Sequence, residues 1–192
     1  MSSFTDTLKS IDNAVLLFIN GMHTPFLDSF MMVVSNRLIW IPLYLFLVYL
    51  IIRKYGKSSW LLIVFGILAV ALSDQLASNL IKNLVMRYRP SHNLWLAPHL
   101  HFVADYMGGQ YGFASSHAAN TFALATFIML IMPKYRNLTI ALFCWALLVC
   151  YSRMYLGVHY PSDILGGMIV GGFSAWICYK LWQLVSKRLA LG

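Results

Sequence analysis

Long apolar stretches with almost no charge are the feature that most limits what this chain can fold into. An α-helix rises 1.5 Å per residue, so about 20 residues cross the hydrocarbon core of a bilayer. No stretch alternates apolar and polar residues with the period of two that a membrane β-barrel needs. The sequence therefore predicts an all-α, polytopic membrane helix bundle with five transmembrane spans. The spans are expected at residues 38–52 (extending back toward residue 26), 58–81, 116–132, 138–152 and 161–179.

The composition agrees with a membrane protein. Hydrophobic residues make up 60% of the chain and charged residues only 10%, whereas a soluble domain carries about 25% charged residues. This balance excludes both an ordinary soluble domain and a disordered chain. The length of 192 residues suits one domain over residues 1–192. The three cysteines lie inside apolar runs and are interpreted as packing residues.

The first 25 residues have a different pattern. Apolar side chains recur at helical spacing in this segment and are interrupted by Asp6, Lys9 and Asp12. We expect an amphipathic helix that lies in the membrane interface. A sixth crossing of the membrane is the alternative that the pattern leaves open.

The net charge of +8 is interpreted through the positions of the cations. In a soluble protein it would suggest nucleic acid as a partner, but here most cations flank spans, so we expect no nucleic acid. Three sets fall at one end of the bundle, which the positive-inside rule makes cytoplasmic. These are Arg53, Lys54 and Lys57, then Lys134 and Arg136, then Lys180, Lys187 and Arg188.

The opposite end also carries cations, against that rule. It receives the loop 82–115 and the turn 153–161, with Lys82, Arg87, Arg89 and Arg153. Residues that break a local preference often mark a functional site. Arginine offers a planar fork for phosphate oxygens and lysine a point charge. Three of these cations around one pocket suit a phosphate dianion better than a carboxylate, and Arg87 is either a further substrate contact or a lipid-headgroup contact.

Polar residues around two helix starts complete this chemistry. Ser115 and Ser116 lie just before and at the start of the span expected at residues 116–132, where free backbone N–H groups favour an anion. Asp163, in the expected first turn of the last span, can reach back to His159, fix its tautomer and leave the other ring nitrogen free to attack. His117 can donate a proton to the leaving oxygen. This set fits phosphoryl transfer, and none of its members suggests a metal.

Three segments together resemble the signature of the type-2 phosphatidic acid phosphatase superfamily. That family, which also holds bacterial acid phosphatases and vanadium haloperoxidases, has the patterns Lys-x6-Arg-Pro, Pro-Ser-Gly-His and Ser-Arg-x5-His-x3-Asp. Residues 82–90 and 152–163 match the first and third patterns in full. Residues 114–117 read Ala-Ser-Ser-His, with Ala for Pro and Ser for Gly. The extra side chain of Ser116 narrows the pocket or adds a hydroxyl.

The resemblance implies a role for each residue of these segments. His159 would be the nucleophile that forms a phosphohistidine, Asp163 would orient it, and His117 would protonate the leaving group. Phosphate would be bound by four side chains and by the backbone N–H groups of Ser116 and His117. The four are Lys82, Arg89, Ser115 and Arg153. Outside these segments, Asp74 is interpreted as a structural partner of a polar group on another span, and the loop 91–112 as a cover over the pocket.

The function implied is that of an integral membrane lipid phosphatase without a metal or other cofactor. Its partners would be the bilayer and a lipid phosphate or diphosphate, with no obligate protein partner evident. Undecaprenyl diphosphate and lipid A phosphates lead the substrates, and phosphatidylglycerol phosphate and phosphatidic acid remain possible. The expected location is the inner (cytoplasmic) membrane, with a periplasmic active site. Open alternatives are a lipid or sugar phosphotransferase, a haloperoxidase, which the membrane-embedded body argues against, and an inactive lipid-binding protein.

Overall fold

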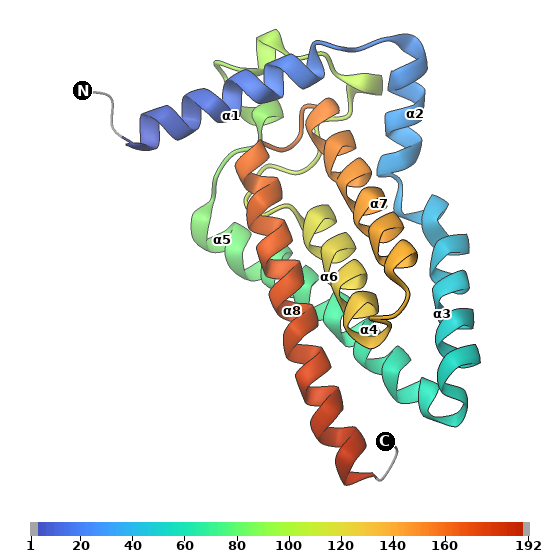
Figure 1. Ribbon diagram of the computed structural model, residues 1–192. Coiled ribbons are helices and arrows are strands. Elements are labelled where there is room, and N and C mark those ends of the chain that lie inside the picture. The colour runs from blue at the N-terminus through green and yellow to red at the C-terminus, as the bar shows by residue number, and fades with distance from the viewer. Residues whose placement is uncertain (1–3, 190–192) are drawn as a thin grey trace.

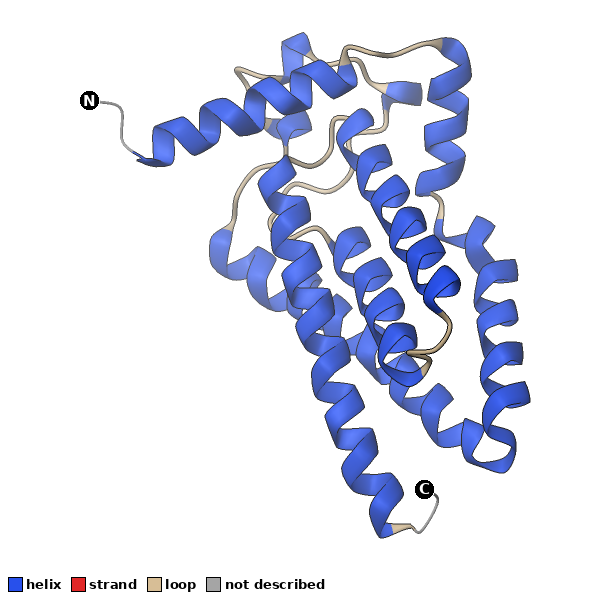
Figure 2. Cartoon of the chain, viewed as in Figure 1, coloured by secondary structure: helices blue, strands red, loops and turns tan. Residues whose placement is uncertain are grey.

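Apolar helices packed side by side form the body of the protein in the computed structural model, which describes residues 4–189 (Figure 1). None of these described residues belongs to a β-strand, as Figure 2 shows. The expected all-helical class is therefore confirmed. The five expected spans correspond to the helices α3 (Ile41–Tyr55), α4 (Ser59–Gln75), α6 (Ser116–Ile131), α7 (Arg136–Tyr155) and α8 (Pro161–Arg188).

Three helical stretches are long and apolar enough to cross a membrane: Arg37–Val85, Arg136–Tyr155 and Pro161–Arg188. The first holds α3 and α4, which turn back on each other at η2 (Gly56–Ser58). The apolar helix α6 has only 16 residues, fewer than a straight crossing needs. The chain is thus a helical membrane protein, while the number of five crossings remains a proposal.

The N-terminal region differs from the expected long first span. Two separate helices, α1 (Phe4–Asn20) and α2 (Pro25–Ser35), precede it. Asn36 ends α2, and its side-chain oxygen accepts a hydrogen bond of 2.9 Å from the backbone N–H of Leu38. This contact starts η1 (Arg37–Trp40), so the continuous run expected over residues 26–52 is divided into two helices. Helix α1 lies across the end of the bundle where α8 begins (Figure 1).

After α4 the chain stays helical and runs toward this same end of the bundle. It passes through the π-helix η3 (Leu76–Ile81) into α5 (Lys82–Val85) and stops at Met86, whose φ of 47° is left-handed. The loop therefore begins at residue 86, four residues after the expected boundary, and Lys82 is still helical. Residues 86–115, with the short turns η4 (Pro90–His92), η5 (Ala97–His99) and η6 (Val103–Asp105), form what we call the outer loop.

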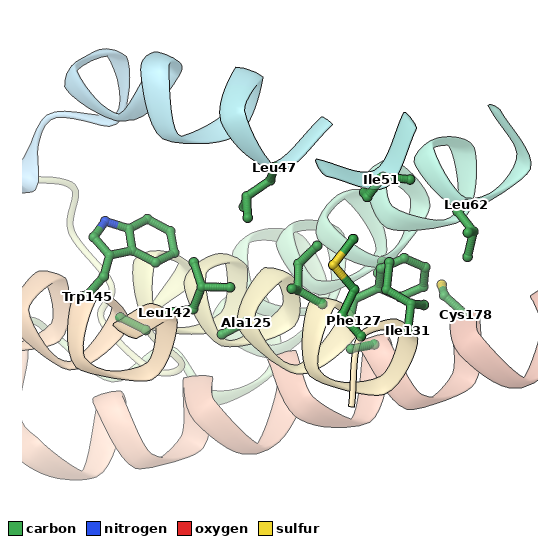
Figure 3. Close-up of a cluster of buried hydrophobic side chains, with 14 of the residues drawn as sticks. Leu47, Ile51, Leu62, Ala125, Phe127, Ile131, Leu142, Trp145 and Cys178 are labelled. Atoms are coloured by element: carbon green, nitrogen blue, oxygen red, sulfur yellow. The ribbon is translucent and has the colours of Figure 1, made fainter. Parts of the chain in front are cut away.

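Helix α6 lies in the centre of the bundle. Small residues on it are fully buried, and the backbone of α8 approaches closely at Gly167 and Gly171. A Cβ at Gly171 would lie 2.1 Å from the carbonyl oxygen of Ala119. Gly167 and Gly171 are four residues apart, and this spacing of small residues allows close helix packing, as is common in membrane helices. Larger side chains fill the space toward α3 and α7, including Leu47, Phe127 and Trp145 (Figure 3).

Candidate active site

A polar cavity of about 250 Å³ lies where the outer loop meets the helix ends. It brings together the three sequence segments that carry the expected chemistry, although they are far apart in the chain. The expected residues that line it are Lys82, Arg89, Ser116, His117, Arg153 and His159. The other lining residues are Arg37, Asp74, Ser78, Tyr106 and Asn120.

Two buried arginines reach this cavity with donors that have no partner. Arg89 lies in an extended segment that pairs with residues 110–112, and its Nε donates to the carbonyl of Tyr111 at 3.0 Å. Arg153 donates from Nη1 to Ser35 Oγ and from Nη2 to Tyr106 Oη, the second at 2.9 Å. Among the described residues, Arg89 Nη1 and Arg153 Nε are buried without an acceptor. Buried donors are normally satisfied, and both arginines line the cavity, which makes an anion a suitable acceptor for them.

Arg89 lies in the outer loop, beyond the end of the helix. The helix stops at residue 86, and the guanidinium is instead held by backbone pairing with the far end of the outer loop. Burial and the nearby charge of Arg153 lower the pKa of Arg89 to about 10. The guanidinium therefore stays charged at neutral pH, which an anion site requires.

Lys82 is held by the side chain of Ser116, the residue that replaces the glycine of the family pattern. Its Nζ donates to Ser116 Oγ at 2.8 Å, and Ser78 Oγ lies 2.7 Å from the same oxygen. The Ser116 side chain thus orients the lysine. Asp74 accepts a 2.8 Å hydrogen bond from Asn120 of α6, which confirms its expected role as a partner of a polar group on another helix.

Ser115 is placed differently from the other expected phosphate ligands. Its side chain is fully buried and caps α6, accepting from the backbone N–H of Ala118 at 3.5 Å. Its backbone N–H donates to the carbonyl of Asp163 at 2.9 Å. Ser115 is not among the described residues that line the cavity, and both of these contacts lie at the start of α6.

His159 and Asp163 form the expected pair. Their Nδ1 and Oδ2 atoms are 3.3 Å apart, and the same Oδ2 accepts from the backbone N–H of Tyr160 at 3.0 Å. Asp163 sits in the first turn of α8 behind Pro161. Burial, together with the charges of Arg89, Arg153 and Lys82, lowers the pKa of His159 well below its ordinary value. A neutral imidazole that donates from Nδ1 to the carboxylate keeps the Nε2 lone pair available as a nucleophile.

Arg87 is not among the described residues that line the cavity, and two carboxylates hold its guanidinium. Its Nη1 contacts Asp163 Oδ1 at 3.0 Å, and its Nη2 contacts Asp12 Oδ2 at 2.8 Å. Its guanidinium also stacks over the ring of Tyr160 at 4.0 Å. Arg87 therefore links α1 to the start of α8 and holds the carboxylate that orients His159.

Arg37 and Tyr106 are cavity residues that the sequence argument missed. Arg37 lies at the outer end of the first span, so the positive-inside argument that singled out Arg89 also applied to it. Tyr106 had no such signal, because its position depends on the path of the outer loop.

Arg37 also lines a second, apolar cavity of about 560 Å³ between α3, α4, α6 and α7. Asp74, His117 and Asn120 border both cavities as well, so apolar and polar spaces adjoin here.

Comparisons with known proteins agree with this geometry. Residues 59–187 match the PAP2 superfamily. The chain is 38% identical over 184 residues to "Lipid A 4′-phosphatase" of Bacteroides thetaiotaomicron, covering 95% of this chain and 81% of that protein. It is 33% identical over 184 residues to the protein of the same name from Porphyromonas gingivalis, covering 94% and 77%. The crystal structure of Aquifex aeolicus LpxE superposes with a TM-score of 0.67 at 25% identity, covering 88% of this chain and 94% of that one.

Proposed function

This chain belongs to the PAP2 superfamily and is a phosphoric monoester hydrolase of membrane lipids, and from that premise we propose that it removes the 4′-phosphate of lipid A. The names of its relatives from Bacteroides thetaiotaomicron and Porphyromonas gingivalis support this substrate. The observation that carries the proposal is the pair of unpartnered guanidinium donors, Arg89 Nη1 and Arg153 Nε, beside His159 in one cavity.

The proposed reaction follows from the positions of the side chains. The phosphate oxygens accept hydrogen bonds from Arg89, Arg153 and Lys82, which neutralise charge in the transition state. His159 Nε2 attacks phosphorus and forms an N–P bond, while the P–O bond to the sugar breaks. His117, which takes up a proton from water when the phosphate dianion binds beside it, gives this proton to the leaving oxygen. Water then attacks the phosphohistidine with His117 as the base, which releases inorganic phosphate and restores both imidazoles.

Lipid tails need an apolar space beside the phosphate. The cavity of about 560 Å³ adjoins the polar cavity, and acyl chains would enter it while the sugar lies at the boundary near Arg37. Such a site at a helix end lets the substrate react without leaving the bilayer.

The proposed topology has α3, α4, α6, α7 and α8 as the five crossings. Basic residues around the α3–α4 turn, the α6–α7 turn and the end of α8 favour a cytoplasmic location for that end. The polar cavity would then open on the periplasmic side of the inner membrane. Helix α1 would lie in the interface, because Leu16 and Ile19 pack inward while Ile11 and Phe18 are 53% and 70% exposed.

A lipid diphosphate such as undecaprenyl diphosphate is the second candidate, and Arg37 is the observation that favours it. Lys82 and three arginines line the polar cavity with one carboxylate, Asp74, so a monoester dianion leaves positive charge unmatched. The exposed guanidinium of Arg37 donates no hydrogen bond to another side chain or to the backbone within residues 4–189. A second phosphate next to the transferred one would neutralise it.

The decisive experiment measures phosphate release by purified wild type and His159→Ala in detergent with EDTA. The substrates are lipid A 4′-phosphate, undecaprenyl diphosphate, phosphatidylglycerol phosphate and phosphatidic acid. We expect release by the wild type alone, fastest from lipid A. Fastest release from undecaprenyl diphosphate would instead support the second candidate substrate. Transfer of labelled phosphate to an added lipid or sugar in place of water would identify a phosphotransferase, and equal release by His159→Ala would refute the nucleophile.

A further inference from the structure

The outer loop has an unusual backbone just where it passes over the two buried arginines. Ala104 and Asp105 have φ values of 48° and 56°, in the left-handed region that side chains other than glycine rarely adopt. Gly108, with a φ of 67°, lies so close that a Cβ there would be 2.5 Å from Arg89 Nη1. Such backbone conformations persist where the surroundings fix them, and they cluster at functional sites.

Between these positions the loop directs Tyr106 into the polar cavity. Its hydroxyl oxygen accepts the 2.9 Å hydrogen bond from Arg153 Nη2, and the guanidinium carbon lies 5.4 Å from the ring centroid. A tyrosine hydroxyl can accept and also donate one hydrogen. Within residues 4–189, no protein acceptor receives the Tyr106 hydroxyl hydrogen.

We propose that Tyr106 is a phosphate ligand: its oxygen holds Arg153, and its hydroxyl hydrogen is donated to an oxygen of the bound phosphate. The inference rests on the proposed function, since it assumes that the polar cavity binds the phosphate. It adds a donor from a segment that no signature motif covers, and it explains why the loop is held in this conformation.

The contacts of Arg153 support this role. Ser35 and Tyr106 each accept a hydrogen bond from one terminal nitrogen of Arg153. These two bonds fix the plane of the guanidinium and leave Nε as the donor for the anion. Burial raises the pKa of Tyr106, but the charge and hydrogen bond of Arg153, together with the charges of Arg89 and Arg37, lower it overall. A more acidic hydroxyl is a stronger donor to an anion.

The test measures binding of inorganic phosphate to purified protein in detergent by calorimetry, because this readout needs no lipid turnover. Tyr106→Phe removes the donor and one anchor of Arg153, whereas Ser35→Ala removes the other anchor and no donor to the anion. A charge-assisted hydrogen bond corresponds to a factor of about ten or more in affinity. We therefore expect Tyr106→Phe to weaken phosphate binding about tenfold or more, and clearly more than Ser35→Ala. Trp95→Phe, on the same loop with a side chain that is 86% exposed, is the control and should bind as wild type.

Equal losses in Tyr106→Phe and Ser35→Ala would show that Tyr106 acts only through Arg153, and unchanged binding in Tyr106→Phe would refute any role. If Tyr106→Phe does not fold, 3-fluorotyrosine at position 106 keeps the contact with Arg153 and makes the hydroxyl more acidic. Phosphate should then bind at least as tightly as in wild type, and weaker binding would contradict the proposal. A chain that binds phosphate in this way but hydrolyses no lipid A would refute the proposed function alone.

Discussion

At the scale of single residues, the site depends on a histidine that burial keeps neutral. Burial and the charges of Arg89, Arg153 and Lys82 lower the pKa of His159, so the protonated form is disfavoured before substrate binds. We predict that His159 gains its proton at a lower pH than an ordinary imidazole, whose midpoint is about 6.5. Histidine-labelled NMR in detergent, with His159→Ala to assign the signal, measures this directly. A midpoint at or above about 6.5, the ordinary value, would contradict the burial argument.

Arg87 provides the second prediction at this scale. Its partner Asp163 is fully buried, and removing one member of such a pair leaves an uncompensated charge. We expect Arg87→Met to lower the free energy of unfolding by about 3 kcal/mol and to reduce kcat, because Asp163 loses a contact that positions it. Thermal unfolding and steady-state kinetics measure the two effects.

Phosphate affinity separates this role from that of a ligand. Arg87 does not line the polar cavity, so Arg87→Met should bind inorganic phosphate close to the wild-type affinity. The control is Arg53→Met, which should leave both stability and kcat near wild type. In the described part of the chain, the exposed guanidinium of Arg53 donates a hydrogen bond to the hydroxyl of Tyr49. A large loss of phosphate affinity in Arg87→Met alone would restore the ligand role.

At the scale of elements, the packing of α8 on α6 sets where His159 and His117 face each other. Adjacent glycines on α8 allow a matched comparison, since a Cβ at Gly171 would meet the backbone of Ala119 at 2.1 Å, whereas one at Gly172 meets only Thr126 Oγ1 at 4.0 Å. We predict that Gly171→Ala destabilises the protein by about 1–3 kcal/mol, as overpacking does, and lowers activity. Gly172→Ala should be neutral or stabilising by up to about 1 kcal/mol, because alanine favours helix. Thermal unfolding of both variants tests this, and similar behaviour of the two would refute the close approach.

The elements also show where sequence patterns were sufficient. Apolar runs predicted the helices α3, α4, α6, α7 and α8, because an uncharged apolar run of about 15 or more residues is a strong signal for a membrane helix. The break between α2 and α3 was missed, since it depends on one side-chain contact from Asn36. The extended pairing that holds Arg89 was missed as well, because it joins segments about 20 residues apart through backbone atoms.

At the scale of the whole molecule, the prediction concerns orientation in the membrane. Trp95 in the outer loop is 86% exposed, and Lys57 is exposed in the turn between α3 and α4. With Cys144, Cys150 and Cys178 replaced by alanine, a membrane-impermeant maleimide should label Trp95→Cys in intact spheroplasts. It should label Lys57→Cys only after lysis. The reverse pattern would place the polar cavity on the cytoplasmic side.

The sequence alone determined the helical membrane class and the residues of the three segments, because apolar length and chemical identity are local properties of the chain. The expected assembly of His117, His159, Lys82, Arg89 and Arg153 around one cavity agrees with the structure. Only the tertiary structure decided that Arg87 pairs with Asp12 and Asp163, that Ser115 caps α6, and that Arg37 and Tyr106 reach the cavity. Which partner a side chain meets depends on the path of the outer loop and the placement of α1. Those are fixed by contacts between residues distant in sequence, and no local pattern records them.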